Sequence, residues 1–236
     1  LRLHKSKLVR ARQRLEHLSL HDALTGLPNR RFVDQMISQP PRPDPQDRLI
    51  LIHIDLDRFK EINDTKGHAG GDMVLQTTAS RLADLTGPND VAARIGGDEF
   101  VVASWSTDPE PKAAELARQI VDALQQTIFI DGAGYVVGAS VGVAWETESA
   151  RDRDLGQLLL NADLALYEAK KAGRGRAAVF TEELRSAAIQ AKELADEFNQ
   201  ALERDELVAF FQPQFNANTL DIAGVEALAR WAHPRK

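Results

Sequence analysis

The chain has 236 residues, enough for one large domain or for one ordinary domain with flanking segments. Apolar residues make up 43% of the chain, which is normal for a globular core, and no apolar run is long enough for a transmembrane helix. The absence of cysteine excludes disulfides and thiolate zinc sites. The net charge of −6 argues against a general nucleic-acid-binding surface but not against a nucleotide held through metal ions and local Lys or Arg side chains.

Residues 1–20 are predicted to form a basic signalling helix or linker, with Leu1, Leu8, Leu15 and Leu18 in a heptad-like pattern. Two interpretations stay open: a solvated helix that packs on the next domain, or the end of a coiled coil that delivers a signal. The repeat is shorter than the roughly three or four heptads that identify a coiled coil. Because the chain begins at Leu1 and not at Met, we expect a piece of a longer protein.

A compact domain is expected over residues 21–180. Its strands are predicted at residues 49–54, 91–95, 99–103, 135–143 and 177–180, and its helices at 57–63, 72–85, 113–124 and 155–169. Gly96-Gly97 joins two of the strands in a hairpin pattern. The order strand, helices, strand, strand, helix, strand, helix predicts an α/β (α+β) fold of the ferredoxin-like type, with a central sheet that contains antiparallel strands.

Residues 181–236 differ in character. A charged, Ala-rich stretch without Gly or Pro over 182–204 predicts a linker helix, and residues 207–211 and 225–231 are expected to form short elements. The segment is too short for a second core of useful size, so we expect only the beginning of another domain.

The strongest chemical signal is a pair of carboxylates after the first strand, Asp55 and Asp57, with two more, Asp98 and Glu99, in the hairpin turn. If the strands are neighbours, Asp55 and Asp98 meet above the same sheet edge. Together with the Leu56 carbonyl they would offer oxygen ligands to a hard cation such as Mg²⁺. Each has a plainer alternative: Asp57 caps the next helix, which is the interpretation we prefer, Asp98 is a turn residue, and Glu99 faces water.

Other candidates lie around this point. Residues 67–71 (GHAGG) precede a helix, where backbone N–H groups can face an anion. Asn63 and Asp72 flank them and could recognise a purine edge, although helix capping is the plainer role for Asp72. Lys170 and Arg174, near the end of a helix, either complement its dipole or contact phosphates.

These residues fall in motifs that resemble the GGDEF family of diguanylate cyclases, whose domain has a nucleotide-cyclase type of sheet. The motifs are residues 21–31 (HDALTGLPNRR), 55–64 (DLDRFKEIND), 67–72 (GHAGGD), 94–100 (RIGGDEF) and 162–174 (ADLALYEAKKAGR). The resemblance covers residues 20–180 and implies condensation of two GTP molecules into cyclic di-GMP and pyrophosphate by a homodimer.

The resemblance also implies roles for individual residues. Asp55, the Leu56 carbonyl and Asp98 would hold Mg²⁺, with Mn²⁺ as the alternative ion. Asp98 and Glu99 would act in catalysis, Asp98 as the suggested base for the 3′-hydroxyl, and the choice between metal binding and proton transfer stays open for Glu99. Lys60 would join them as a catalytic phosphate contact.

For the substrate, the resemblance implies that Asn63 and Asp72 bind guanine and that Lys170 and Arg174 bind the phosphates. One position departs from the family pattern. Residues 87–90 (GPND) stand where many members have Arg-x-x-Asp, a site at which the product inhibits the enzyme. Because Gly87 replaces the Arg, we expect no strong product inhibition through this site.

The tail resembles the opening of an EAL-family cyclic di-GMP phosphodiesterase in residues 211–213 (FQP) and 225–231 (VEALARW). We therefore expect a parent protein with an upstream sensor and a complete EAL domain, in the cytoplasm or attached to a membrane with this domain on the cytoplasmic side. Two other functions stay open. One is a catalytically silent GTP-binding module that regulates an attached phosphodiesterase, and the other is a different nucleotidyl cyclase.

Overall fold

The structure is a computed structural model that describes residues 19–38, 43–147 and 155–232. The basic helix expected over residues 1–20 lies almost wholly outside the described residues. The chain divides into two compact units, with the boundary between Leu184 and Arg185. No helix in the described ranges is both long and apolar enough to cross a membrane.

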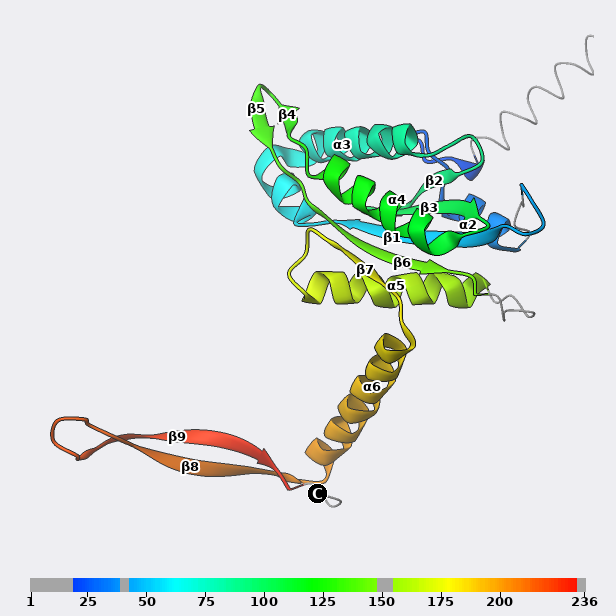
Figure 1. Cartoon of the computed structure of the whole chain (residues 1–236). Coiled ribbons are helices and arrows are strands. Elements are labelled where there is room, and N and C mark those ends of the chain that lie inside the picture. The colour runs from blue at the N-terminus through cyan, green and yellow to red at the C-terminus, as the bar shows by residue number, and fades with distance from the viewer. Residues whose placement is uncertain (1–18, 39–42, 148–154, 233–236) are drawn as a thin grey trace, which may run out of the picture. The chain divides into compact units, whose positions relative to one another are not determined.

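A mixed five-stranded sheet forms the centre of the first unit (Figure 1). Its strands are β1 (Arg48–Leu56), β2 (Val91–Gly96), β3 (Glu99–Ser106), β6 (Ala139–Trp145) and β7 (Ala177–Val179). They are arranged in the order β2-β3-β1-β6-β7, with β1 antiparallel to both neighbours and β6 parallel to β7. The predicted mixed α/β fold with a central sheet is confirmed.

Helices cover both faces of this sheet, with α3 and α4 on one side and α5 on the other (Figure 1). The helices of the unit are α2 (Arg30–Ser38), α3 (Phe59–Leu85), α4 (Pro109–Leu124) and α5 (Leu155–Lys171). Successive β1 side chains point to opposite faces of the sheet. Ile52 packs in the cluster with α3 and α4, and Leu51 packs in the cluster with α2. A strand covered on both faces is apolar throughout, which explains why residues 49–54 predicted it well.

Helix α3 corresponds to the two helices expected at 57–63 and 72–85, which meet at a kink. It runs from Phe59 to Leu85 and is bent at Gly67, where φ is 68° and ψ is 178°. Glycine accepts this positive φ without the steric cost of a Cβ, so the bend falls at this residue. Residues 68–71, which were expected to precede a helix, are therefore already helical after the bend.

The strand predicted at 135–143 is divided in the structure. Its first part belongs to β5 (Ala133–Tyr135), which pairs with β4 (Ile128–Ile130) in a separate hairpin, and its second part is β6 in the central sheet. Residues 136–138 between them are irregular. Alternation of apolar residues continues across the break, so periodicity alone could not show it.

The second unit contains most of α6 (Glu182–Glu203) and a hairpin of β8 (Leu207–Phe215) and β9 (Ile222–Trp231). The hairpin is attached to the end of α6 by an edge-to-face contact between the rings of Phe198 and Trp231, whose centroids are 5.6 Å apart. The Trp231 indole N–H also donates a hydrogen bond to the Glu206 carboxylate at 3.2 Å.

Candidate active site at the end of strand β1

Three carboxylates gather where β1 ends. Asp55, the penultimate residue of β1, lies opposite Glu99, the first residue of β3. Asp98 lies in the turn between β2 and β3, and its carbonyl accepts a hydrogen bond from the Leu56 N–H at 3.2 Å. The pairing of β1 with β3 thus brings the two acidic motifs to one edge of the sheet.

Lys170, in the last turn of α5, supplies a positive charge to this cluster. Its Nζ lies 2.7 Å from Asp55 Oδ2, and the two side chains are 33% and 15% exposed. Burial raises the pKa of Asp98, and the charges of Asp55 and Glu99 raise it further, while Lys170 opposes the shift. Lys170 therefore contacts Asp55 and acts on the charge of Asp98, while the three carboxylates together leave negative charge in excess.

This excess and the type of donor fit a divalent cation. Within the described residues, no three acidic or histidine side chains are close enough to form a ready-made metal site. The donors that remain are the carboxylates of Asp55 and Asp98 and the Leu56 carbonyl, all oxygens of the kind that Mg²⁺ accepts together with substrate phosphates. A cation here would offset the charges of Asp55 and Glu99, which add to burial in raising the pKa of Asp98.

The neighbouring Asp57 does not cap α3, so the preferred interpretation of this residue was wrong. The residue before α3 is Arg58, with φ 59° and no side-chain cap. Asp57 instead accepts hydrogen bonds from the Ser140 hydroxyl at 2.7 Å and from the Gly175 N–H at 2.9 Å. It therefore joins the end of β1 to β6 and to the loop after α5. These partners are 83 and 118 residues away in sequence, so no local pattern could reveal them.

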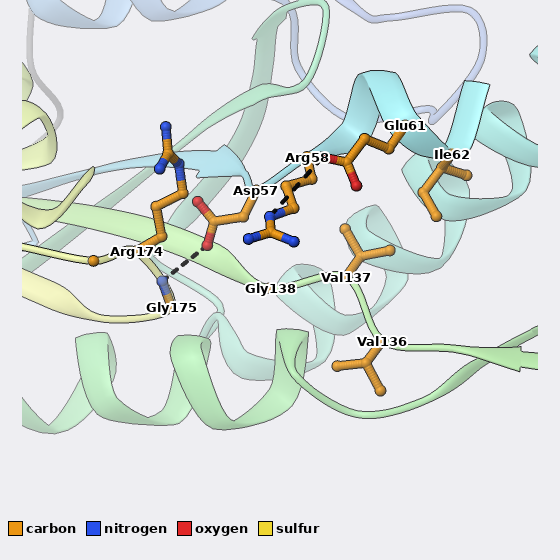
Figure 2. Close-up of a pocket in the computed structure, with 10 residues that line it drawn as sticks. Asp57, Arg58, Glu61, Ile62, Val136, Val137, Gly138, Arg174 and Gly175 are labelled. Carbon is orange, nitrogen blue, oxygen red and sulfur yellow. Dashed lines mark hydrogen bonds and ion pairs between the residues drawn. The ribbon is translucent and has the colours of Figure 1, made fainter. Parts of the chain in front are cut away.

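A pocket of about 410 Å³ opens beside Asp57, and Figure 2 shows the residues that line it. The side chains of Arg58 and Arg174 lie on opposite sides of the Asp57 carboxylate (Figure 2). Apolar side chains of Ile62 and Val137 form another part of its lining. Arg174, one of the predicted phosphate contacts, thus lines this pocket together with Asp57.

Asn63 and Asp72 lie on either side of the bend in α3. The Asn63 amide oxygen occupies the space that a Cβ on Gly71 would need, so only glycine at 71 admits this position of the amide. Asp72 follows directly and is exposed, as is Lys60 in the first turn of the helix. In the described part of the chain, no hydrogen bond or ion pair joins these three side chains to the carboxylate cluster.

Sequence reasoning missed the contacts of Arg94 that stabilise the turn carrying Asp98. Arg94 donates hydrogen bonds to the Gly97 carbonyl at 3.1 and 2.8 Å and forms an ion pair of 2.9 Å with Asp22. Burial alone would raise the pKa of Asp22, but hydrogen bonds from Thr25 and Arg94 lower it. The motif at residues 21–31 therefore holds the turn of the motif at 94–100.

Comparison with known proteins identifies the family of the chain. The sequence model described as "Diguanylate cyclase, GGDEF domain" matches residues 19–176. The chain belongs to this family. The GGDEF domain of TpbB (YfiN) from Pseudomonas aeruginosa superposes with a TM-score of 0.64 at 34% identity, over 71% of this chain and 98% of that one.

Two relatives from Pseudomonas aeruginosa are similar to this chain over nearly its whole length. The bifunctional diguanylate cyclase/cyclic di-GMP phosphodiesterase MucR is 37% identical over 232 residues, 98% of this chain, and the cyclic di-GMP phosphodiesterase NbdA is 34% identical over 233 residues, 97% of this chain. The chain spans only 33% and 29% of their lengths. The comparisons support a diguanylate cyclase type of function for the GGDEF domain.

The turn at residues 87–90 stands where many family members have the inhibitory Arg-x-x-Asp site. In this GGDEF domain the Asp90 carboxylate accepts a hydrogen bond from the Gly87 N–H at 3.0 Å and lies 3.5 Å from Lys112 Nζ. Asp90 thus stabilises its own turn, and no guanidinium stands at position 87 to bind an anion beside it.

Proposed function

We propose that the chain is a diguanylate cyclase, which condenses two GTP molecules into cyclic di-GMP and releases pyrophosphate. The single observation that supports this most is the cluster of Asp55, Asp98 and Glu99 with Lys170 at the end of β1. Its excess negative charge suits a metal-bound triphosphate, and its lysine suits the phosphate oxygens.

Asp55, Asp98 and the Leu56 carbonyl would hold Mg²⁺, or Mn²⁺ in its place, and the ion would neutralise charge on the triphosphate and on the leaving pyrophosphate. The 3′-oxygen of one GTP forms a bond to the α-phosphorus of the other, and the bond from that phosphorus to the oxygen bridging to the β-phosphorus breaks, which releases pyrophosphate. The same step in the opposite direction closes the ring and releases a second pyrophosphate. Asp98 accepts the 3′-hydroxyl proton as the general base. Glu99, opposite Asp55, adds to the field that favours the cation.

The remaining site residues bind the substrate. Lys170 contacts phosphate from its place against Asp55, and Arg174 extends phosphate binding into the pocket of Figure 2. Lys60 approaches the phosphates from the first turn of α3. Asn63 and Asp72 hydrogen-bond guanine, whose N1–H and N2–H₂ groups are donors that match a carboxylate acceptor.

One chain provides one such site, and the reaction needs two nucleotides that face each other. The active species is therefore a homodimer that holds one GTP in each subunit, and its geometry controls the rate through positioning. We further propose that the parent protein is cytoplasmic, or attached to a membrane with this domain in the cytoplasm, and has an upstream sensor. An EAL domain follows residues 21–180 in this proposal, as it would in a bifunctional parent of the kind that MucR's name describes.

The test is product formation. Concentrated protein is incubated with GTP and Mg²⁺, and the nucleotides are separated by chromatography. The unaltered chain and the control variant Asp122→Ala, which loses an exposed carboxylate on α4, should form cyclic di-GMP, and Asp98→Ala should not. Product from Asp98→Ala at the control rate would remove the proposed role of this cluster.

A second candidate is a catalytically silent GTP-binding module that regulates an attached phosphodiesterase. It is favoured by the similarity to NbdA, whose name gives phosphodiesterase activity alone. Tight GTP binding without product, also in an artificially linked dimer, would support this candidate over the cyclase.

A further inference from the structure

Two polar contacts join β1 to α5 on the same face of the sheet. His53 and Asp55 are two residues apart on β1, so their side chains project to one side. Asp163 and Lys170 are seven residues apart on α5, which places both on one face of the helix. His53 Nδ1 lies 3.3 Å from Asp163 Oδ1, and Lys170 Nζ lies 2.7 Å from Asp55 Oδ2. The two contacts are thus successive links between the strand and the helix.

The neighbouring strand β6 allows α5 to lie this close to the sheet. Gly142 is the register partner of His53 on β6. A Cβ on Gly142 would overlap the Ala162 carbonyl oxygen and the backbone nitrogen of Leu166. The backbone of α5 therefore rests directly on β6 beside His53, and the contact with Asp163 forms at the point of closest approach.

His53 has no role in the proposed reaction, yet it occupies a costly position. Only 6% of the residue is exposed, and neither ring nitrogen has a well-aligned hydrogen bond within the described residues. Leu51 fills the equivalent place one step earlier on this face of β1. An apolar residue would avoid burying the imidazole, so the contact with Asp163 is the feature that distinguishes His53 from a core residue.

Both His53 and Lys170 affect the pKa of Asp163. Its contact with His53 lowers its pKa despite partial burial, and the charge of Lys170 lowers it further. Its side chain is 61% exposed, so packing does not hold it in place. The contact with His53 adds a polar link between this turn of α5 and β1, beside the buried Ala162 and Leu166 that pack the turn on the sheet.

We propose that His53 and Asp163 are positioning residues, which fix the place of α5 along β1 and thereby hold Lys170 against Asp55. The inference rests on the proposed function for its consequence, since Lys170 would contact the triphosphate. A shift of the helix by one residue would move Lys170 by about 1.5 Å and turn it by about 100°. The ammonium group would then no longer lie over the carboxylate cluster.

The first measurement needs no nucleotide. Purified chain is treated briefly with an amine-acylating reagent, and mass spectrometry compares labelling of Lys170 with that of its exposed neighbour Lys171. Asp163→Ala and His53→Leu should raise the Lys170 to Lys171 ratio several-fold, and Asp163→Asn, whose amide oxygen can keep the polar contact with His53 Nδ1, should retain most of the protection. The control Glu168→Gln removes a carboxylate from the same helix and should leave the ratio unchanged. An unchanged ratio in Asp163→Ala would overturn the proposal.

The second measurement is calorimetric binding of a non-reactive α,β-methylene GTP analogue. Asp163→Ala should bind it about as weakly as Lys170→Ala, and the double variant should be no weaker than Lys170→Ala alone, because the effect passes through Lys170. A purely electrostatic role predicts the opposite sign, since loss of a negative charge would tighten triphosphate binding. Additive losses or tighter binding would therefore contradict the proposal. If labelling responds as expected but the unaltered chain does not bind the analogue, the positioning role stands and the proposed function fails.

Discussion

Replacing Gly71 with alanine tests whether Asn63 recognises guanine without altering Asn63 itself. The added Cβ would fall on the Asn63 amide oxygen, and it would also lie 3.1 Å from the ring of Phe59. The amide must therefore leave its present position in the Gly71→Ala variant. Because Gly71 lies in a helical part of α3, the backbone itself can accept alanine.

The expected effects on stability and on binding differ in size. Alanine in place of glycine within a helix stabilises by about 0.5 to 1 kcal/mol, while overpacking against Phe59 and Asn63 costs about 1 to 3 kcal/mol. The free energy of unfolding should therefore fall by no more than about 2.5 kcal/mol. Loss of two hydrogen bonds from Asn63 to guanine, at about 0.5 to 1.5 kcal/mol each, should weaken GTP binding by about 5- to 150-fold.

The assay is calorimetric titration with the α,β-methylene analogues of GTP and ATP, together with thermal unfolding. Gly71→Ala should lose affinity for the GTP analogue and lose the preference for guanine over adenine, and Asn63→Ala should behave in the same way. Gly224→Ala is the matched control, since a Cβ there meets nothing closer than 3.8 Å. If Gly71→Ala binds the GTP analogue as tightly and as selectively as the unaltered chain, Asn63 does not read guanine from its present position.

Three further outcomes follow from the site. Lys170→Ala should lower kcat/KM for GTP by about 100- to 1,000-fold in a steady-state assay, as for other groups that stabilise transition-state charge. The control Lys171→Ala should lower it by less than about 3-fold. Equal losses in the two variants would contradict a specific role of Lys170 in the reaction. Asp98→Asn should raise the melting temperature at pH 7 but not at pH 3. The pKa of Asp98 is higher in the folded than in the unfolded chain, so the folded chain binds more protons between these two pKa values and its stability falls as the pH rises through that window. Asp122→Asn is the control, and an equal gain in melting temperature at both pH values would contradict the argument. Cyclic di-GMP titrated into the cyclase assay should give no inhibition at low micromolar concentration, since Gly87 offers no guanidinium; inhibition there that a Gly87 substitution alters would refute this.

The fold was predictable where local pattern and long-range packing agree. The apolar run at 49–54 predicted β1 because both of its faces are covered, and the Gly96-Gly97 hairpin predicted β2 and β3 because a turn acts over a few residues. The sequence predicts that Asp55 and Asp98 meet if β1 pairs with the hairpin. In the structure β1 pairs with β3, and Asp55 lies opposite Glu99, so this condition is met.

The features that sequence reasoning missed depend on contacts between distant segments. Asp57 precedes a helix and therefore looked like a cap, but its hydrogen bonds go to Ser140 and Gly175, on elements that reach it only after the sheet and α5 are packed. The break between β5 and β6 leaves the apolar alternation intact, and β4 is too short to show a period. In the same way, Arg94 near the Gly-Gly turn gives no sign in sequence that its partner is Asp22.

The same distant contacts explain why the charge cluster can exist in a folded chain. Burial raises the pKa of Asp98, and the neighbouring carboxylates of Asp55 and Glu99 raise it further, so gathering these charges has a cost. Asp55 tolerates its neighbours because α5 delivers Lys170, and α5 lies within reach because Gly142 lets its backbone touch β6. Because Lys170 balances one of three negative charges, the site is left with the affinity for further positive charge that a metal-bound triphosphate needs. A substitution that moves α5 should therefore change the charge balance of the site even when it touches none of the carboxylates.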